Sequence, residues 1–173
     1  MLEAIIFVVF AFSMAYAALS DLLTMTIANR VTLVLLATFA IVAPLTGMDL
    51  ATYGMHFAAG AMVLAATFVL FAMGGVGGGD AKLVSAVAVW CGFGMPLVEY
   101  LIYSALLGGW ITMAIILWRG SFVAEMAGGR FEFLDRISRK DAGVPYGIAL
   151  GIAGLIAAPS MPLVEWAVKS VAG

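Results

Sequence analysis

Charged residues are scarce in this sequence. Lys, Arg, Asp and Glu make up 10% of the 173 residues, whereas 65% are hydrophobic and the mean hydropathy is +1.15. A soluble domain carries about a quarter charged residues, so a cytosolic enzyme is excluded. A disordered chain is excluded too, because disorder requires low hydrophobicity and high net charge, and the net charge here is −2. The composition predicts one domain embedded in lipid.

Cysteine is nearly absent as well. The single cysteine, Cys91, cannot form an internal disulfide and cannot build a multi-cysteine metal cluster. We expect it to pack as a small apolar residue, and we expect neither a metal ion nor a cofactor. The pI near 5.2 gives no indication of a nucleic-acid partner.

Six uncharged runs lie between the charged residues. Each is about long enough to cross a hydrocarbon core of roughly 30 Å, which predicts an all-α polytopic membrane protein with six transmembrane helices. The first run is expected to be a retained helix rather than a secretory signal, because its start carries Glu3 and no Lys or Arg. The fourth is expected to be short, because Gly92, Gly94 and Pro96 end its pattern early. The runs are 4–20, 31–48, 50–79, 83–98, 100–118 and 142–164.

The Lys and Arg residues are distributed unevenly across the predicted membrane. Because such residues are enriched in cytoplasmic loops, the side with most of them is predicted to be cytoplasmic, and both termini periplasmic. Segment 119–142 becomes the main cytoplasmic loop of a single domain over residues 1–173. Its basic residues are explained either by anionic lipid or by substrate docking. The cytoplasmic set is Arg30, Lys82, Arg119, Arg130, Arg136, Arg139 and Lys140, with Lys169 on the other side.

Two aspartates lie at the same predicted depth, on the cytoplasmic side. Asp21 ends the first predicted helix, and Asp80 ends the third, directly after the glycine-rich run 74–79. Irregular backbone near a membrane is tolerated where it lines a cavity. The run lacks the Gly-Lys-Ser/Thr ending of a phosphate-binding loop. Two close carboxylates cannot both ionise, so one can stay protonated while the other acts as general base on a shared water.

Three blocks of the sequence resemble the bacterial type IV prepilin peptidases, especially the small form found in tight-adherence (Flp) pilus systems. Residues 77–83, GGGDAKL, are similar to the Gly-x-Gly-Asp-x-Lys signature of that family, whose Gly-x-Gly-Asp core also occurs in presenilin-type intramembrane aspartic proteases. Asp21 followed by residues 27–29 (IAN) resembles the first block, and residues 144–147 (VPYG) resemble the third. Ala28 stands where the family commonly has proline, and this predicts looser geometry around Asn29 without loss of activity.

The resemblance implies an aspartic endopeptidase that removes the leader of Flp-like pilin precursors. Asp21 and Asp80 would be the catalytic pair, at the cytoplasmic face of the bacterial inner membrane. The implied partners are a pilin precursor and membrane lipid. A helix break explains the two glycines of the signature equally well, helix packing explains block 144–147, and Lys82 is expected to be a topological anchor. The implied substrate-binding residues are Gly77, Gly79, Asn29, Pro145, Tyr146 and Gly147.

Two other function classes stay open at this point. A small ion- or proton-coupled transporter also places acids beside broken helices, but near the middle of the membrane. A non-enzymatic membrane subunit of a pilus or secretion machine would tolerate alanine at Asp21 or Asp80. The single histidine, His56, is predicted to lie toward the outer side, packed or interfacial and away from both aspartates.

Overall fold

The structure is a computed structural model that describes residues 1–119, 138 and 143–172, and this part of the chain contains helices and no strand. The predicted cytoplasmic loop 119–142 therefore lies outside the described residues, apart from Arg119 and Ser138. The helices are α1 (Leu2–Thr24), α2 (Asn29–Leu45), α3 (Leu50–Ala72), α4 (Gly78–Cys91), α5 (Met95–Arg119), α8 (Tyr146–Ala157), the 3-10 helix η1 (Ala158–Ser160) and α9 (Pro162–Ala172).

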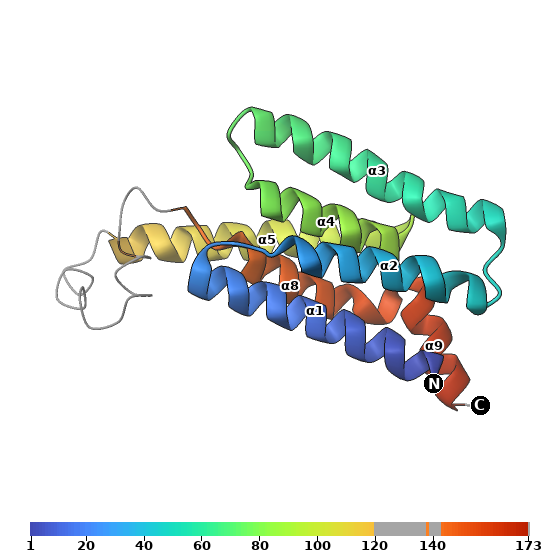
Figure 1. Ribbon diagram of the computed structural model, residues 1–173. Helices are drawn as coiled ribbons and strands as arrows, with labels where there is room; N and C mark the ends of the chain where they lie inside the picture. Colours follow the sequence, from blue (N-terminus) through green and yellow to red (C-terminus); the bar gives the residue numbers. More distant parts are fainter. Residues whose placement is uncertain (120–137, 139–142, 173) are drawn as a thin grey trace.

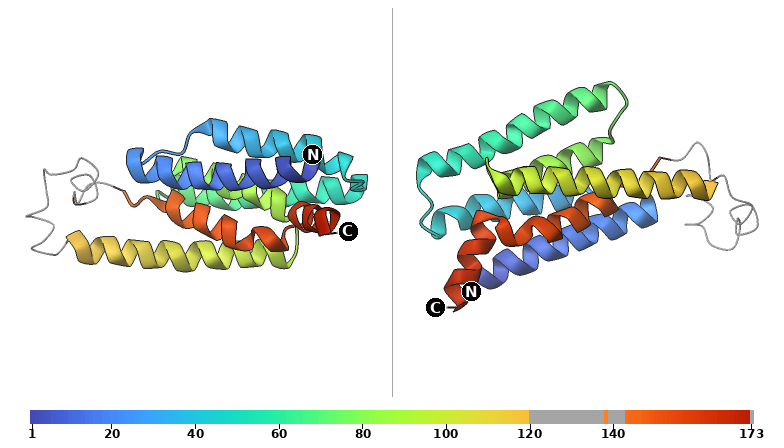
Figure 2. Two further views of the ribbon diagram at one scale, coloured as in Figure 1. Left: turned by 90° about the horizontal axis from the view of Figure 1, so that it is seen from below. Right: turned by 180° about the vertical axis from the view of Figure 1, so that it is seen from behind.

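The helices form an elongated bundle. From α1 to α5 and on to α8, each helix runs along the bundle in the direction opposite to the one before it (Figure 1). The N- and C-termini lie together at one end (Figures 1 and 2). The last residues of α1 and the first residues of α4 and α8 lie at the opposite end. Since the chain reverses after each helix, residues far apart in sequence meet at that end.

The centre of the bundle is α4. Every residue from Leu83 to Gly92 is buried, and the helix packs against α2, α3 and α8. It ends at Cys91 because Gly92 adopts a left-handed φ of 65°. The prediction of an early end is thereby confirmed. A helix surrounded by protein does not need the roughly 20 residues that a lipid-exposed span requires.

Large aromatic side chains hold the bundle together around Trp90. Its ring lies 4.9 Å from that of Phe10 and 6.0 Å from that of Phe39, centroid to centroid. Its indole Nε1–H donates a 3.1 Å hydrogen bond to the carbonyl oxygen of Leu35, so the polar end of the ring is satisfied. The neighbouring Cys91 is buried and free, which confirms the packing expected for it.

Fewer helices than expected are long enough to cross a membrane alone. Among the described residues, helices α1, α3 and α5 are long and apolar enough to span a membrane, judged by length and composition. A fourth span is added if α8 and α9 count as one, although they meet at a bend of 52°. The expected sixth helix is thus broken, next to Pro159 and Pro162. Six spans, periplasmic termini and a single domain over the whole chain remain predictions.

The third predicted helix is shorter than its uncharged run. Helix α3 ends at Ala72, and Gly74 adopts a left-handed φ of 77° that turns the chain back. Gly77 is extended and caps α4, so Asp80 lies in the first turn of α4. The expectation that Asp80 ends the third helix was therefore wrong. A glycine run can end one helix or begin the next, and here it does both.

Candidate functional site

Asp21 and Asp80 meet at one cavity, at the end of the bundle opposite the termini. Both line a cavity of about 610 Å³ together with Met25, the glycine-rich turn 74–77 and Tyr146. Both also line an adjoining cavity of about 250 Å³, which reaches Asn29. Since both residues line both cavities, they border one shared space. The structure therefore brings together two acids that are 59 positions apart, from residue 21 to residue 80.

The Asp21 side chain is held by α8. It lies in the last turn of α1 and is 5% exposed. Its Oδ2 accepts a 2.7 Å hydrogen bond from the backbone N–H of Gly147, in the first turn of α8. A Cβ placed on Gly147 would lie 2.6 Å from the Cβ of Asp21, a distance that real Cβ atoms essentially never show. Glycine at this position therefore allows the backbone to approach the carboxylate.

Asp80 is positioned by the N-terminus of α4. It is the third residue of that helix, where a carboxylate is favoured by the helix dipole. A Cβ on Gly77, the capping residue, would lie 2.7 Å from its Oδ2. A Cβ on Gly79 would lie 3.3 Å from the Cβ of Ile27, in the linker between α1 and α2. Both glycines line the smaller cavity, so the space they leave serves the site as well as the packing.

Asn29 is tied to Lys82, a residue that the sequence analysis set aside as an anchor. The ammonium group of Lys82 donates a 3.1 Å hydrogen bond to Oδ1 of Asn29, the first residue of α2. Asn29 lines the smaller cavity. The bond joins residues 53 positions apart. Their presence in two blocks of the family pattern was the one sequence signal that could have paired them.

The third block contributes unequally to the site. Tyr146 lines the larger cavity, its ring lies over Gly108 of α5, and its hydroxyl accepts a hydrogen bond of 3.4 Å from Thr112. Pro145 is buried as the capping residue of α8. Gly147 touches Asp21, as described above. Pro145 accordingly packs within the bundle, and Tyr146 forms a wall of the cavity; the substrate-binding roles implied for both remain predictions.

Two residues at the site were missed by the sequence analysis. Met25 lines both cavities and has a left-handed φ of 55°, which is uncommon for a residue other than glycine. Its N–H donates a 2.8 Å hydrogen bond to the backbone oxygen of Asp21, so the end of α1 is fixed there. Arg119 donates a 2.9 Å hydrogen bond to the carbonyl oxygen of Gly143, which lines the larger cavity. No local pattern marks either residue.

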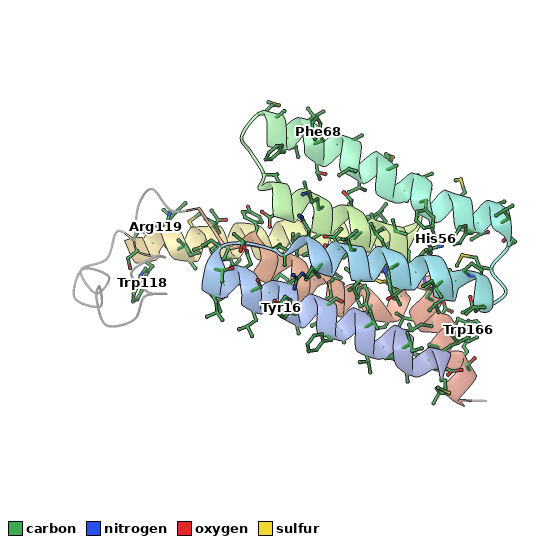
Figure 3. The ribbon with its side chains drawn as sticks, viewed as in Figure 1. Tyr16, His56, Phe68, Trp118, Arg119 and Trp166 are labelled. Atoms are coloured by element: carbon green, nitrogen blue, oxygen red, sulfur yellow. The ribbon has the colours of Figure 1, made fainter. Side chains whose placement is uncertain are left out.

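The single histidine of the chain, His56, lies far from this cavity. Figure 3 shows Arg119 at the end of the bundle that holds the site, and His56 toward the other end, where Trp166 also lies. His56 is buried, and its Nδ1 lies 2.7 Å from the carbonyl oxygen of Val89. The expectation of a packed histidine is confirmed. In the part of the chain that the structure describes, no three His, Cys, Asp or Glu side chains form a group able to hold a metal ion.

Comparison with known proteins identifies the family. No curated protein and no solved structure matches the chain. The model of the type IV leader peptidase family matches residues 8–124, which include Asp21, Asn29 and Asp80 but not Gly147. The match supports a leader-peptidase-like function, hence a protease, and together with the long apolar helices it indicates an integral membrane protein. The resemblance seen in the sequence is thereby confirmed: the chain belongs to the type IV leader peptidase family.

Proposed function

We propose that this protein is a membrane aspartic endopeptidase that removes the leader peptide of Flp-like pilin precursors at the cytoplasmic face of the inner membrane. The observation that carries the proposal is the cavity shared by Asp21 and Asp80, whose carboxylates come from the ends of two different helices within the family match. A transporter is not favoured, because both acids lie at the end of the bundle rather than at its middle.

The two carboxylates divide the work of peptide hydrolysis. The ionised partner removes a proton from a water held between them, and the protonated partner donates a hydrogen bond to the scissile carbonyl. The water oxygen adds to the carbonyl carbon, the C–N bond breaks, and the amine of the mature pilin leaves with a proton. Gly147 orients Asp21 through its N–H, and Gly77 and Gly79 leave room beside Asp80 for an extended substrate segment.

The distribution of charged residues supports both the proposed substrate and the proposed orientation of the protein in the membrane. The charged residues that line the larger cavity, Asp21 and Asp80, are acidic, which suits the short basic leader that the family resemblance implies. Arg30 and Lys82 lie near the starts of α2 and α4, at the same end of the bundle as the cavity, whereas Lys169 lies in α9 near the termini. This distribution favours a cytoplasmic position for the site.

The test is leader removal from a pilin precursor by the purified protein in liposomes. Asp21→Asn and Asp80→Asn keep the size of the side chain and remove the acid, so cleavage should fall by at least about 100-fold in each. Asp49→Asn is the matched control, because it makes the same change at an exposed helix cap outside the site.

Three results would be informative in different ways. Loss of cleavage in both site variants, with the control active and all proteins folded, supports the catalytic pair. Full cleavage by either site variant contradicts the aspartic mechanism. No cleavage by the wild type returns the transporter and the non-enzymatic subunit as explanations.

A further inference from the structure

Asn29 carries the only side-chain amide of the chain, because the sequence contains one asparagine and no glutamine. It lines the smaller cavity together with Asp21 and Asp80. An amide has an oxygen that accepts hydrogen bonds and an NH2 group that donates two. The group that faces the cavity decides what Asn29 can bind there.

The amide oxygen of Asn29 does not cap the helix that it begins. Asparagine at a helix start commonly accepts hydrogen bonds from the first backbone N–H groups. In the described part of the chain, Oδ1 of Asn29 accepts from the ammonium group of Lys82, at 3.1 Å, and from no backbone N–H. Helix capping therefore does not explain this side chain.

Lys82 determines which group of the amide stays available. An ammonium group has three donors and no acceptor, so it pairs with the oxygen of the amide and leaves the NH2 group for other partners. Within the described residues, that NH2 group donates to nothing. Lys82 itself lines an apolar pocket beside α3 and neither cavity of the two acids. Asn29 thus connects Lys82 with the smaller cavity.

Lys82 is not placed to act on Asp80 directly. The two residues are two positions apart in α4, and side chains at that spacing do not face each other on a helix. Both belong to the described part of the chain, and no ion pair joins them there. The contact of Lys82 with the site therefore passes through Asn29.

The smaller cavity is rich in acceptors and poor in donors. Of the described residues that line it, Asn29 alone has an N–H group in its side chain. The hydroxyl of Thr26, which also lines it, lies 2.7 Å from the hydroxyl of Thr24 and is engaged there. An extended peptide in the cavity brings backbone carbonyls, which require hydrogen-bond donors once they leave water. The NH2 group of Asn29 can supply that hydrogen bond.

We propose that the NH2 group of Asn29 binds a backbone carbonyl of the substrate next to the cleaved bond, and that Lys82 is the positioning residue that directs this group into the cavity. The proposal rests on the proposed function and adds the atom that binds and the residue that orients it. The bound carbonyl is not the one that is cleaved, so the bond is equally strong in the substrate complex and in the transition state. Such a bond lowers KM and leaves kcat unchanged.

The first test measures KM and kcat for a pilin precursor. Asn29→Ala removes the donor and should raise KM by about fivefold with kcat unchanged, which corresponds to one lost hydrogen bond. Lys82→Met leaves the amide free to rotate and should raise KM by about threefold, since the binding orientation is then only partly populated. Lys82→Arg keeps a donor and should match the wild type. Lys169→Met is the matched control, because Lys169 pairs with Glu165 in α9 at the other end of the bundle.

A double variant separates positioning from a direct effect of the Lys82 charge. If Lys82 acts through Asn29, Lys82→Met should cause no further rise of KM in the Asn29→Ala protein. The dependence of kcat on pH should also be the same in Lys82→Met and in the wild type. An equal rise of KM with and without Asn29, or a shifted pH profile, would overturn the positioning role.

A spectroscopic test observes the amide itself and does not depend on the folding of Asn29→Ala. With one asparagine and no glutamine, the chain should give a single pair of side-chain amide signals in its NMR spectrum. In isotopically labelled Asp80→Ala protein, which should bind precursor without cleaving it, these signals should shift when unlabelled precursor is added. The added change Lys82→Met should reduce the shift. Unchanged signals, although the precursor co-purifies with the protein, would contradict the binding role.

The failures of the two proposals are distinguishable. If the wild type cleaves the precursor and Asn29→Ala has a normal KM, the amide does not bind the substrate, although the leader peptidase function stands. If the wild type does not cleave the precursor, the proposed function fails, and the proposal for Asn29 and Lys82 fails with it.

Discussion

The orientation of Asp21 depends on a residue 126 positions away in the chain. The N–H of Gly147 holds Oδ2 of Asp21 at 2.7 Å, and no side chain fits between the two backbones. The family resemblance implies substrate binding for Gly147, whereas its contacts are with the carboxylate. We therefore expect Gly147 to be a positioning residue, one that acts on catalysis through Asp21.

Replacing Gly147 by alanine should displace Asp21. A misplacement of about 1 Å at a reacting group costs on the order of 100-fold, so Gly147→Ala should lower kcat for leader removal by about that factor. Gly109→Ala is the control, because a Cβ there meets nothing within 4 Å. Thermal unfolding separates the effect on catalysis from a loss of folding, and a folded Gly147→Ala protein with normal kcat would refute the positioning role.

Among the helices, α3 has a side-chain cap at the end of the bundle that holds the termini. Oδ1 of Asp49 accepts hydrogen bonds of 3.0 Å from the backbone N–H groups of Ala51 and Thr52. Hydrogen bonds with the side chain and then the backbone of Thr52, together with that from Ala51, hold the pKa of Asp49 below its usual range. Because the folded state prefers the charged carboxylate, the stabilisation is complete above the unfolded pKa and is lost as the pH falls through the folded one.

Removing this cap should destabilise α3 in a pH-dependent way. At neutral pH, Asp49→Ala should unfold at a lower temperature than the wild type, and Asp49→Asn should retain most of the stability, because asparagine is also a good cap. As the pH falls below the usual range of a carboxyl group, the wild-type unfolding temperature should approach that of Asp49→Ala. Thermal unfolding in detergent across this pH range measures the two unfolding temperatures. A difference between wild type and Asp49→Ala that does not change with pH would contradict the role of Asp49 as a charged cap.

For the molecule as a whole, the two ends of the bundle differ in their basic residues, and only one of them holds the cavity. Arg30, Lys82 and Arg119 lie with the cavity at one end, and the termini and Lys169 lie at the other. Since basic residues are retained on the cytoplasmic side, the bundle should be inserted with the cavity inside and both termini outside.

Labelling with a membrane-impermeant thiol reagent tests this orientation. In a Cys91→Ala background, Ala172→Cys should react from the periplasmic side, and Thr26→Cys, at the exposed turn after α1, should react only after the membrane is permeabilised. Thermal unfolding of each variant shows whether the fold is retained. Reaction of Thr26→Cys from outside would reverse the topology, and reaction of both positions from one side would contradict it.

The local pattern of the sequence was enough for the helical membrane class, the early end of α4 and the family. Apolar runs, glycines and single acids are each recognisable within one or two turns of chain, because they reflect the preferences of nearby residues for lipid, for helix or for a turn. Asp21 and Asp80 were singled out as candidates for this reason, since each carboxylate interrupts an apolar stretch.

The other features of the fold and of the site depend on packing between helices that are far apart in the sequence. Local preferences could not assign Asp80 to α4, because a run of glycines is compatible with either helix, and the turn at Gly74 depends on how α3 and α4 lie together. They also could not show that α4 is buried in protein from Leu83 onward, and so can be too short to cross lipid alone. The bonds of Gly147 with Asp21 and of Lys82 with Asn29 join positions 126 and 53 residues apart. Such pairs form only when the whole bundle is assembled, because the energy that brings them together comes from packing along entire helices rather than from the paired residues.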